Sequence, residues 1–252
     1  MKVTLMPVDK GEVINKLYVA CRTCYNAGTP NDMFREIYWG DKSTPSDILP
    51  FEWDKRTKLL KHVLDSGHHS VLEHVTVTFL ISGVSRALTH QLVRHRLCSY
   101  SQQSQRYVEF KDGKFDYVTP KSIENYNDLL LEYDTFMSQV SSLYAKFTEA
   151  GIPAEDARMI LPNACCTNIT MTVNLRELIH ISNERLCTCA QSEIRKLIYL
   201  MTKEVVKELD FLKPYLVPKC EVLGYCNESP KRSCGRKPQK PEEPKYVPSK
   251  EE

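Results

Sequence analysis

Hydrophobic residues recur at helical intervals in several long stretches of the chain. Apolar positions three or four residues apart are typical of a helix that buries one face. This pattern predicts helices over residues 11–24, 51–65, 85–96, 123–150, 153–161, 174–182 and 188–209. Gly67 and Gly151 follow two of these helices, in the position that glycine favours after a helix C-terminus.

Alternation of apolar and polar residues predicts strands elsewhere in the chain. The predicted strands cover residues 2–6, 76–82, 107–110, 115–119 and 167–173. Residues 26–50 are rich in Gly, Pro, Asn and Asp, and we predict a loop there. Because strands and helices follow one another without regular βαβ alternation, we expect an α+β fold. It would be a single domain over residues 1–218, with a central mixed or antiparallel sheet flanked by long helices.

The chain changes character after Pro218. Prolines recur there among dense Lys and Glu, and such a composition does not form a hydrophobic core. We therefore expect residues 219–252 to be a disordered tail that contains cysteines.

Composition narrows the class of protein. Hydrophobic residues make up 42% and charged residues 26% of the chain, which is ordinary for a soluble globular protein. The net charge of +2 provides no global basic field for nucleic acid. No apolar run reaches the ~18–20 residues that span a bilayer, and the first residues lack the apolar core of a signal peptide. We expect a cytoplasmic protein that binds neither membrane nor nucleic acid.

Five of the ten cysteines lie around the last predicted helix. Cys187 and Cys189 stand at its start, and Cys220, Cys226 and Cys234 follow its end. Four thiolates make a closed structural zinc site, but the spacing here is not that of a CxxC pair. Reduced thiols or a metal are more common than disulfides in a cytosolic chain. The sequence thus leaves zinc, a disulfide and free thiols open for these residues.

Arg94, His95 and Arg96 stand where the third predicted helix ends. Guanidinium groups match phosphate oxygens in pairs, so two arginines beside a histidine indicate an anion site. The loop over residues 99–106 offers many neutral donors and acceptors and closes with Arg106, which suits a polar ring edge and a phosphate. A solvated basic helix end has the same residues. A nucleic-acid patch would also fit, although aromatic residues are few here.

Three histidines and a carboxylate lie within residues 66–74. Their spacing is not the His-Glu-x-x-His of zinc enzymes, and the segment joins a helix end to a strand start. We interpret it as a polar junction beside a pocket and assign no metal ligand. Further along, Arg176, His180 and Arg185 occupy successive turns of the helix that begins at Asn174, which stands in an N-cap position. A polar surface face would show the same spacing.

Taken together, these segments resemble the signature of the flavin-dependent thymidylate synthases. Arg94-His95-Arg96 is followed after seven residues by Ser104, as in that family. The other matching blocks, in the same order, are Gly67-His68-x-Ser70-x-x-Glu73-His74, Gln91, Ser104-Gln105-Arg106-Tyr107, Ala157-Arg158-x-x-Leu161-Pro162, Thr172-Val173-Asn174-x-Arg176, Arg185 and Ala190-Gln191-x-Glu193-Ile194. The resemblance extends over about residues 1–210.

The resemblance implies an activity and an assembly. The family makes dTMP from dUMP, with the carbon from methylenetetrahydrofolate and electrons from NADPH through FAD. It also implies the fold of that family and a homotetramer whose active sites are shared between subunits. A protein that binds nucleotide or nucleic acid without catalysis is the alternative.

Carried over residue by residue, the resemblance gives two binding sets. The residues expected to contact FAD are Ser70, Glu73, Arg94, His95, Arg96, Gln102, Asn174, Arg176 and His180. The residues expected to surround dUMP are Gln91, Arg94, Gln102, Gln103, Ser104, Gln105, Arg106, Arg158 and Arg185.

Arg185 is the expected catalytic residue, because its charge would stabilise negative charge on the uracil imide and activate the carbon to be methylated. Ser104 is expected to bind the nucleotide and not to attack it, because no base stands ready to activate its hydroxyl. The chain departs from the family at three positions. Members often carry an acid at Gln102, a small residue at Gln105 and a histidine near Cys189.

Overall fold

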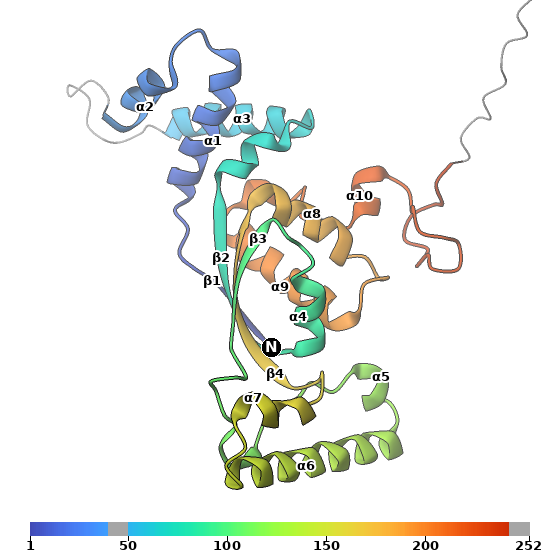
Figure 1. The fold of residues 1–252 in the computed structure, drawn as a ribbon. Coiled ribbons are helices and arrows are strands. Elements are labelled where there is room, and N and C mark those ends of the chain that lie inside the picture. The colour runs from blue at the N-terminus through green and yellow to red at the C-terminus, as the bar shows by residue number, and fades with distance from the viewer. Residues whose placement is uncertain (40–49, 242–252) are drawn as a thin grey trace, which may run out of the picture.

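A computed structural model describes residues 1–39 and 50–241 of the chain. Four strands form one sheet in the order β1-β2-β4-β3, and each pair of neighbours is antiparallel (Figure 1). The strands are β1 (Lys2–Leu5), β2 (Thr76–Ser85), β3 (Cys98–Gln102) and β4 (Cys166–Asn174). The expected α+β class is confirmed, and the central sheet is antiparallel.

The two faces of the sheet differ because side chains alternate along each strand. Phe79 and Ile81 of β2 and Ile169 and Met171 of β4 point to one side and are buried. The helices on that side are α4 (Arg86–Leu92), α8 (Leu175–Arg185) and α9 (Ser192–Glu208). The opposite side, which we call the open face, is mostly polar. Its exposed members include Thr76, Leu80, Ser82, Ser99 and Ser101.

Helices α1 (Lys10–Tyr25) and α3 (Pro50–Asp65) lie together beyond one end of the sheet (Figure 1). Asp9 caps α1 by accepting a hydrogen bond of 2.8 Å from the N–H of Glu12. Gly67 follows α3 with φ +80°, the left-handed conformation that glycine adopts without strain. The 3₁₀ helix η1 (His69–His74) then leads into β2.

A helix occupies part of the segment predicted as a loop over residues 26–50, so that prediction is wrong for α2 (Pro30–Trp39). Pro30 suits the first helical position, and Met33 is buried. The Tyr38 hydroxyl donates to a carboxylate oxygen of Glu12 on α1 at 2.6 Å. The abundance of Gly, Pro, Asn and Asp concealed this short amphipathic helix. Residues 40–49 of the predicted loop lie outside the described residues.

Three further predictions differ from the structure between residues 85 and 119. Helix α4 ends at Leu92 and not at Arg96. Strand β3 forms inside the polar segment expected to be a loop, because β4 offers it a partner. The strands predicted over residues 107–110 and 115–119 are wrong, since the described structure there has a single bridge, Tyr117 with Cys165. Phe110 packs instead on a helix, with its ring 5.8 Å from that of Tyr144.

That helix, α6, lies beyond the other end of the sheet together with its short neighbours (Figure 1). The elements there are η2 (Lys111–Gly113), α5 (Lys121–Glu124), α6 (Asn127–Glu149), α7 (Ala154–Ala157) and η3 (Arg158–Ile160). Gly113 has φ +67°, and a Cβ at this position would stand 2.2 Å from the backbone oxygen of Ser141. The Ser141 hydroxyl donates to the Gly113 carbonyl at 2.6 Å. Only glycine therefore fits where this loop meets α6.

The chain beyond α9 contains η4 (Asp210–Leu212) and α10 (Lys219–Leu223). Cys226 and Gln239 form a parallel bridge, and Cys226 is buried. The structure thus differs from the expected disordered tail over residues 219–241, while residues 242–252 lie outside the description. Among the helices of the described ranges, none combines the length and the apolar character that a membrane crossing requires.

Candidate functional site

The predicted site residues fall into two groups at opposite ends of β4. The first, which we call the α8 cluster, consists of Glu73, His95, Arg176, His180 and Arg185. It lies where β4 passes into α8. There the Asn174 side chain accepts a hydrogen bond of 2.8 Å from the N–H of Glu177, which is an N-cap contact. The cap fixes the start of the helix that carries three of the five residues.

An ion pair joins two residues of the α8 cluster that are 103 positions apart in the sequence. Glu73 of η1 accepts from the guanidinium of Arg176, and both side chains are about half exposed. Ser70 lies on the same 3₁₀ helix and is exposed. The structure therefore brings Glu73 and Arg176 together at a place that solvent or a ligand reaches.

His95 and Arg185 form the buried part of the α8 cluster. Nε of Arg185 donates to Nε2 of His95 at 3.0 Å, and His95 is only 8% exposed. Burial first, and then the charges of Arg185 and His180, lower the pKa of His95 to about 4. The imidazole is therefore neutral and carries its hydrogen on Nδ1, which lies 3.8 Å from a carboxylate oxygen of Glu177. Arg185 keeps its charge and is held by a neutral acceptor.

Tyr100 supports the Arg-His-Arg turn from the covered side of the sheet. Its hydroxyl lies 2.8 Å from the carbonyl oxygen of Leu92 and 2.9 Å from that of His95, so one hydrogen is shared between them. Arg94 and Arg96 are exposed on either side of the buried His95. The turn therefore presents two guanidiniums to the outside while its histidine faces α8.

The α8 cluster is poorly suited to a metal ion. Ligand atoms of His95, Glu177 and His180 lie within 4.8 Å of one another. However, the Arg185 guanidinium uses Nε2 of His95 as its acceptor, and its charge opposes a cation. In the described part of the chain, His68, His69 and His74 belong to no group of three possible ligands. His69 instead contacts the carbonyl oxygen of Leu64 at 3.1 Å.

The second group, the α7 cluster, consists of Ser104, Arg106, Glu155 and Arg158. Two nitrogens of Arg106 contact one carboxylate oxygen of Glu155, at 2.9 and 3.0 Å. Nε of Arg158 donates to the backbone oxygen of Glu155 at 3.1 Å. The Ser104 hydroxyl accepts from the N–H of Arg106 at 3.1 Å. Ser104 thus helps to shape the loop.

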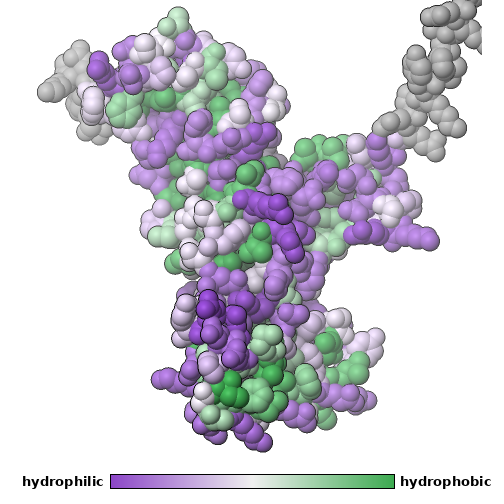
Figure 2. All heavy atoms as spheres, viewed as in Figure 1, coloured by the Kyte–Doolittle hydropathy of each residue, from purple (hydrophilic) through white to green (hydrophobic). Residues whose placement is uncertain are grey.

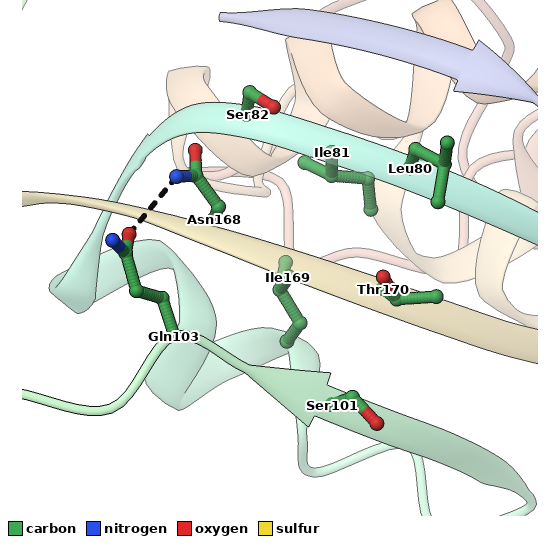
Figure 3. Close-up of a pocket in the computed structure, with 8 residues that line it drawn as sticks. All are labelled: Leu80, Ile81, Ser82, Ser101, Gln103, Asn168, Ile169 and Thr170. Atoms are coloured by element: carbon green, nitrogen blue, oxygen red, sulfur yellow. Dashed lines mark hydrogen bonds between the residues drawn. The ribbon is translucent and has the colours of Figure 1, made fainter. Parts of the chain in front are cut away.

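Three glutamines between the clusters point in different directions. Gln102 lies on the covered side and donates to the Thr89 hydroxyl at 3.1 Å. Gln103 lies on the open face, where its side-chain oxygen accepts from Asn168 at 2.9 Å (Figure 3). Gln103 and Asn168 border a shallow hollow of about 400 Å³ over β2, β4 and β3. The Gln105 amide faces the sulfur of Cys165 at 3.7 Å, and Gln91 lies in the last turn of α4.

The two clusters do not meet within one chain. Strand β4 has nine residues, and at about 3.3 Å per residue its ends are roughly 26 Å apart. Cys98 pairs with Val173 near the α8 cluster, whereas Gln102 pairs with Ile169 toward the α7 cluster. The structure therefore leaves the two clusters apart and divides the expected dUMP contacts, with Arg185 in the α8 cluster and Ser104, Arg106 and Arg158 in the α7 cluster.

Several residues of the site were missed by the sequence analysis. Glu177 stands three positions after the N-cap Asn174, a spacing typical of capping pairs, and this signal was available. Glu155 lies three positions before Arg158, which is a helical neighbour spacing. Tyr100 and Asn168 gave no signal, because their roles depend on the pairing of β3 with β4.

Comparison with known proteins gives one consistent result. The family described as "Thymidylate synthase complementing protein" matches residues 10–209. The chain is 41% identical over 235 residues to a flavin-dependent thymidylate synthase of Nitratidesulfovibrio vulgaris, covering 90% of this chain and 91% of that protein. Proteins of the same name are 43% identical in Geobacter sulfurreducens, covering 86% and 87%, and 44% identical in Pyrococcus furiosus, covering 76% and 80%.

Proposed function

The chain belongs to the flavin-dependent thymidylate synthase family, and from this premise we propose how its two clusters share the reaction. Membership makes the chain an FAD-dependent enzyme of dTMP synthesis, with dUMP and a folate as substrates. The non-catalytic alternative is not favoured. We propose that it has the family's fold, with methylenetetrahydrofolate as the carbon donor and NADPH as the reductant.

The α8 cluster is the proposed FAD site, and its donors fit that group. FAD carries a pyrophosphate, and exposed guanidiniums bind such oxygens in pairs. Arg94, Arg96 and Arg176 provide them, and the Ser70 hydroxyl is accessible beside them. Bound FAD would supply the redox chemistry, while the protein supplies orientation and electrostatics. Among the remaining expected contacts, Asn174 caps α8 and Gln102 faces the covered side.

The α7 cluster is the proposed site of the dUMP phosphate. Arg106 and Arg158 flank Glu155, so a dianionic phosphate would find two guanidiniums in one place. Ser104, Gln103 and Gln105 belong to the segment after β3 that also carries Arg106.

The contact between Arg185 and His95 carries the proposal for catalysis. A neutral histidine accepts from Nε of Arg185 and leaves the rest of the guanidinium available. Placed against the uracil, this charge would stabilise negative charge on the imide and raise electron density at the carbon that is methylated. Its partial burial strengthens the effect, because a charge acts more strongly where water is excluded.

We propose a homotetramer in which one chain gives the α8 cluster and another gives the α7 cluster of each site. The roughly 26 Å between the ends of β4 supports this arrangement.

Helix α6 also exposes Leu129, Phe136 and Leu143, which are spaced by two helical turns, at 53%, 56% and 43%. Figure 2 shows hydrophobic residues gathered over the lower part of the molecule, where α6 lies. A second chain would cover such a stripe.

Tritium release from labelled dUMP tests the reaction. The purified full chain should absorb as a flavoprotein and release tritium when NADPH and methylenetetrahydrofolate are both present. Omission of either should stop the release. A chain that binds flavin but releases no tritium would contradict the proposed activity, and a colourless chain that binds nucleic acid would favour the alternative.

Mixed tetramers test the sharing of sites. Chains with Arg176→Ala and Arg158→Ala should each be impaired alone and regain activity when co-expressed. Under random mixing, about one quarter of the shared sites would have both clusters intact. Arg176→Ala mixed with Arg185→Ala is the matched control, because both changes fall in the α8 cluster and no recovery is expected. Absence of recovery in the first pair would place each site within one chain.

A further inference from the structure

Five cysteines from three separate segments line one small pocket at the end of α8. Cys187 and Cys189 come from the turn between α8 and α9, Cys220 from α10, and Cys226 and Cys234 from the segment that follows. The pocket holds a volume of about 20 Å³, which is room for about one water-sized atom. It is separate from both the α8 cluster and the α7 cluster, since it shares no residue with either.

Two thiols and one carboxylate of this pocket are close enough to share a ligand. The sulfurs of Cys187 and Cys189 and a carboxylate oxygen of Glu228 lie within 4.8 Å of one another. Burial first, and then a hydrogen bond with Cys187, raise the pKa of the Cys189 thiol. Burial also raises the pKa of the Cys220 thiol, and nearby Cys187 and Cys226 add to the effect. All of these cysteines are free thiols in the structure.

The pocket also has basic walls. Arg232, Arg236 and Lys237 line it beside the thiols. A zinc ion with four thiolates carries a net charge of −2. The three cations less their two acidic partners leave +1, which offsets part of that charge. Two of them have acidic partners, Glu228 at 3.7 Å from Arg232 and Glu221 at 2.8 Å from Lys237, so they are held near the pocket.

We propose that Cys187, Cys189, Cys220 and Cys226 bind one structural Zn²⁺ ion. Thiolates are the ligands that closed zinc sites favour, and the four cysteines reach the pocket from three segments of the chain. Binding displaces the thiol protons into solvent and involves no oxidation or reduction. Cys234 is exposed, and its thiol is hydrogen-bonded to Thr188, so it stands at the rim. The volume suits a single ion and is small for an iron–sulfur cluster.

A zinc ion here would fasten the C-terminal segment to the end of α8. Cys220 and Cys226 lie beyond residue 209, where the match to the family ends. The segment already contacts α8 through Asn183, which donates to the Val217 carbonyl at 2.7 Å, and through Lys219, 3.7 Å from Glu184. Cys187 stands two positions after Arg185, so the metal would stabilise the helix end that carries the proposed catalytic residue.

Metal analysis of the purified full chain tests the proposal. We expect about one zinc per chain, released when an organomercurial blocks the thiols and detected with a chromogenic chelator. Cys226→Ser and Cys189→Ser should each lose the zinc. Cys24→Ser is the matched control, because Cys24 is an exposed free thiol on α1, and this variant should keep the metal.

Two further variants separate a lost ligand from a lost fold. Cys226→His should retain zinc, because imidazole is a zinc ligand, whereas a merely structural effect would make it behave like Cys226→Ser. Cobalt in place of zinc should give the thiolate charge-transfer and tetrahedral ligand-field bands of four sulfurs. Three results would overturn the proposal: iron with labile sulfide, no metal after reconstitution in reductant, or zinc lost in Cys234→Ser but kept in Cys226→Ser.

Discussion

The two ends of β4 carry arginines in contrasting surroundings. At one end, Arg185 is partly buried and donates to a neutral, buried His95. At the other end, Arg106 is exposed and paired with the carboxylate of Glu155, which is also half exposed. An arginine held by a neutral acceptor is ready to act on a ligand, while an ion-paired one must first exchange its partner. The comparison indicates that Arg185 is preorganised, whereas Arg106, like Arg176 in its ion pair with Glu73, has to exchange a carboxylate for its ligand.

The largest expected effect comes from removing the preorganised charge. Arg185→Ala should lower turnover by about 10²- to 10³-fold, because loss of one such stabilising group costs about 2.7–4 kcal/mol. Tritium release measures turnover, and flavin absorbance checks that FAD is still bound. Arg35→Ala, at an exposed position of α2, is the control and should leave turnover unchanged. An Arg185→Ala enzyme of nearly normal turnover would remove the main distinction between the two ends.

The neutral His95 should make stability depend on pH. Its pKa falls from 6.5 to about 4 on folding, so the unfolded chain binds a proton more readily. The stabilising contribution is therefore complete above pH 6.5 and lost as pH falls toward 4, by on the order of 3 kcal/mol. Urea unfolding of the full chain at several pH values measures this loss. His95→Gln should flatten the slope over this range, and an unchanged slope would show that His95 is not its source.

Substitution of one arginine in each cluster should weaken the binding of a different ligand. Arg176→Ala should weaken FAD binding and Arg158→Ala should weaken dUMP binding, each by about 10- to 100-fold, since hydrogen bonds to charged groups contribute about 1.5–3 kcal/mol. Calorimetry with each ligand gives both constants for both variants. If Arg158→Ala weakened FAD and dUMP equally, the clusters would not have the separate roles proposed here.

The smallest effect is expected at Ser104. Its hydroxyl accepts from the backbone N–H of Arg106, so Ser104→Ala should weaken dUMP binding only several-fold, in line with about 1 kcal/mol for one neutral hydrogen bond. Turnover at saturating dUMP should stay substantial. Loss of turnover with dUMP binding intact would instead assign Ser104 a chemical role and move it out of the α7 cluster's binding function.

Local periodicity predicted the long helices and the two central strands well, because each of them buries apolar residues within the chain. It failed where partners distant in the sequence decide the structure. Strand β3 is polar on its exposed side and forms because β4 pairs with it. The segment over residues 107–119 has strand-like alternation, but its Phe110 and Tyr117 rings contact Tyr144 and Tyr133 of α6. Helix α2 was concealed by residues that usually indicate loops.

For the site, the sequence supplied the residues and the structure supplied their arrangement. Glu73 and Arg176 were both predicted, but no local signal joins residues 103 positions apart. His95 is neutral because it is buried. The burial of a histidine cannot be deduced from its identity in the sequence. The separation of Arg106 from Arg176 depends on strand register, and it is this distance that makes a second chain necessary in the proposed enzyme.

Glu155 affects both the stability of the ligand-free α7 cluster and the affinity of that cluster for phosphate. Its carboxylate neutralises Arg106 in the ligand-free chain and adds negative charge to the first turn of α7, where helix dipoles favour it. Any phosphate that binds there has to compete with it. Glu155 therefore stabilises the ligand-free α7 cluster and at the same time lowers the affinity of the proposed site for phosphate. This is a trade-off between stability and function.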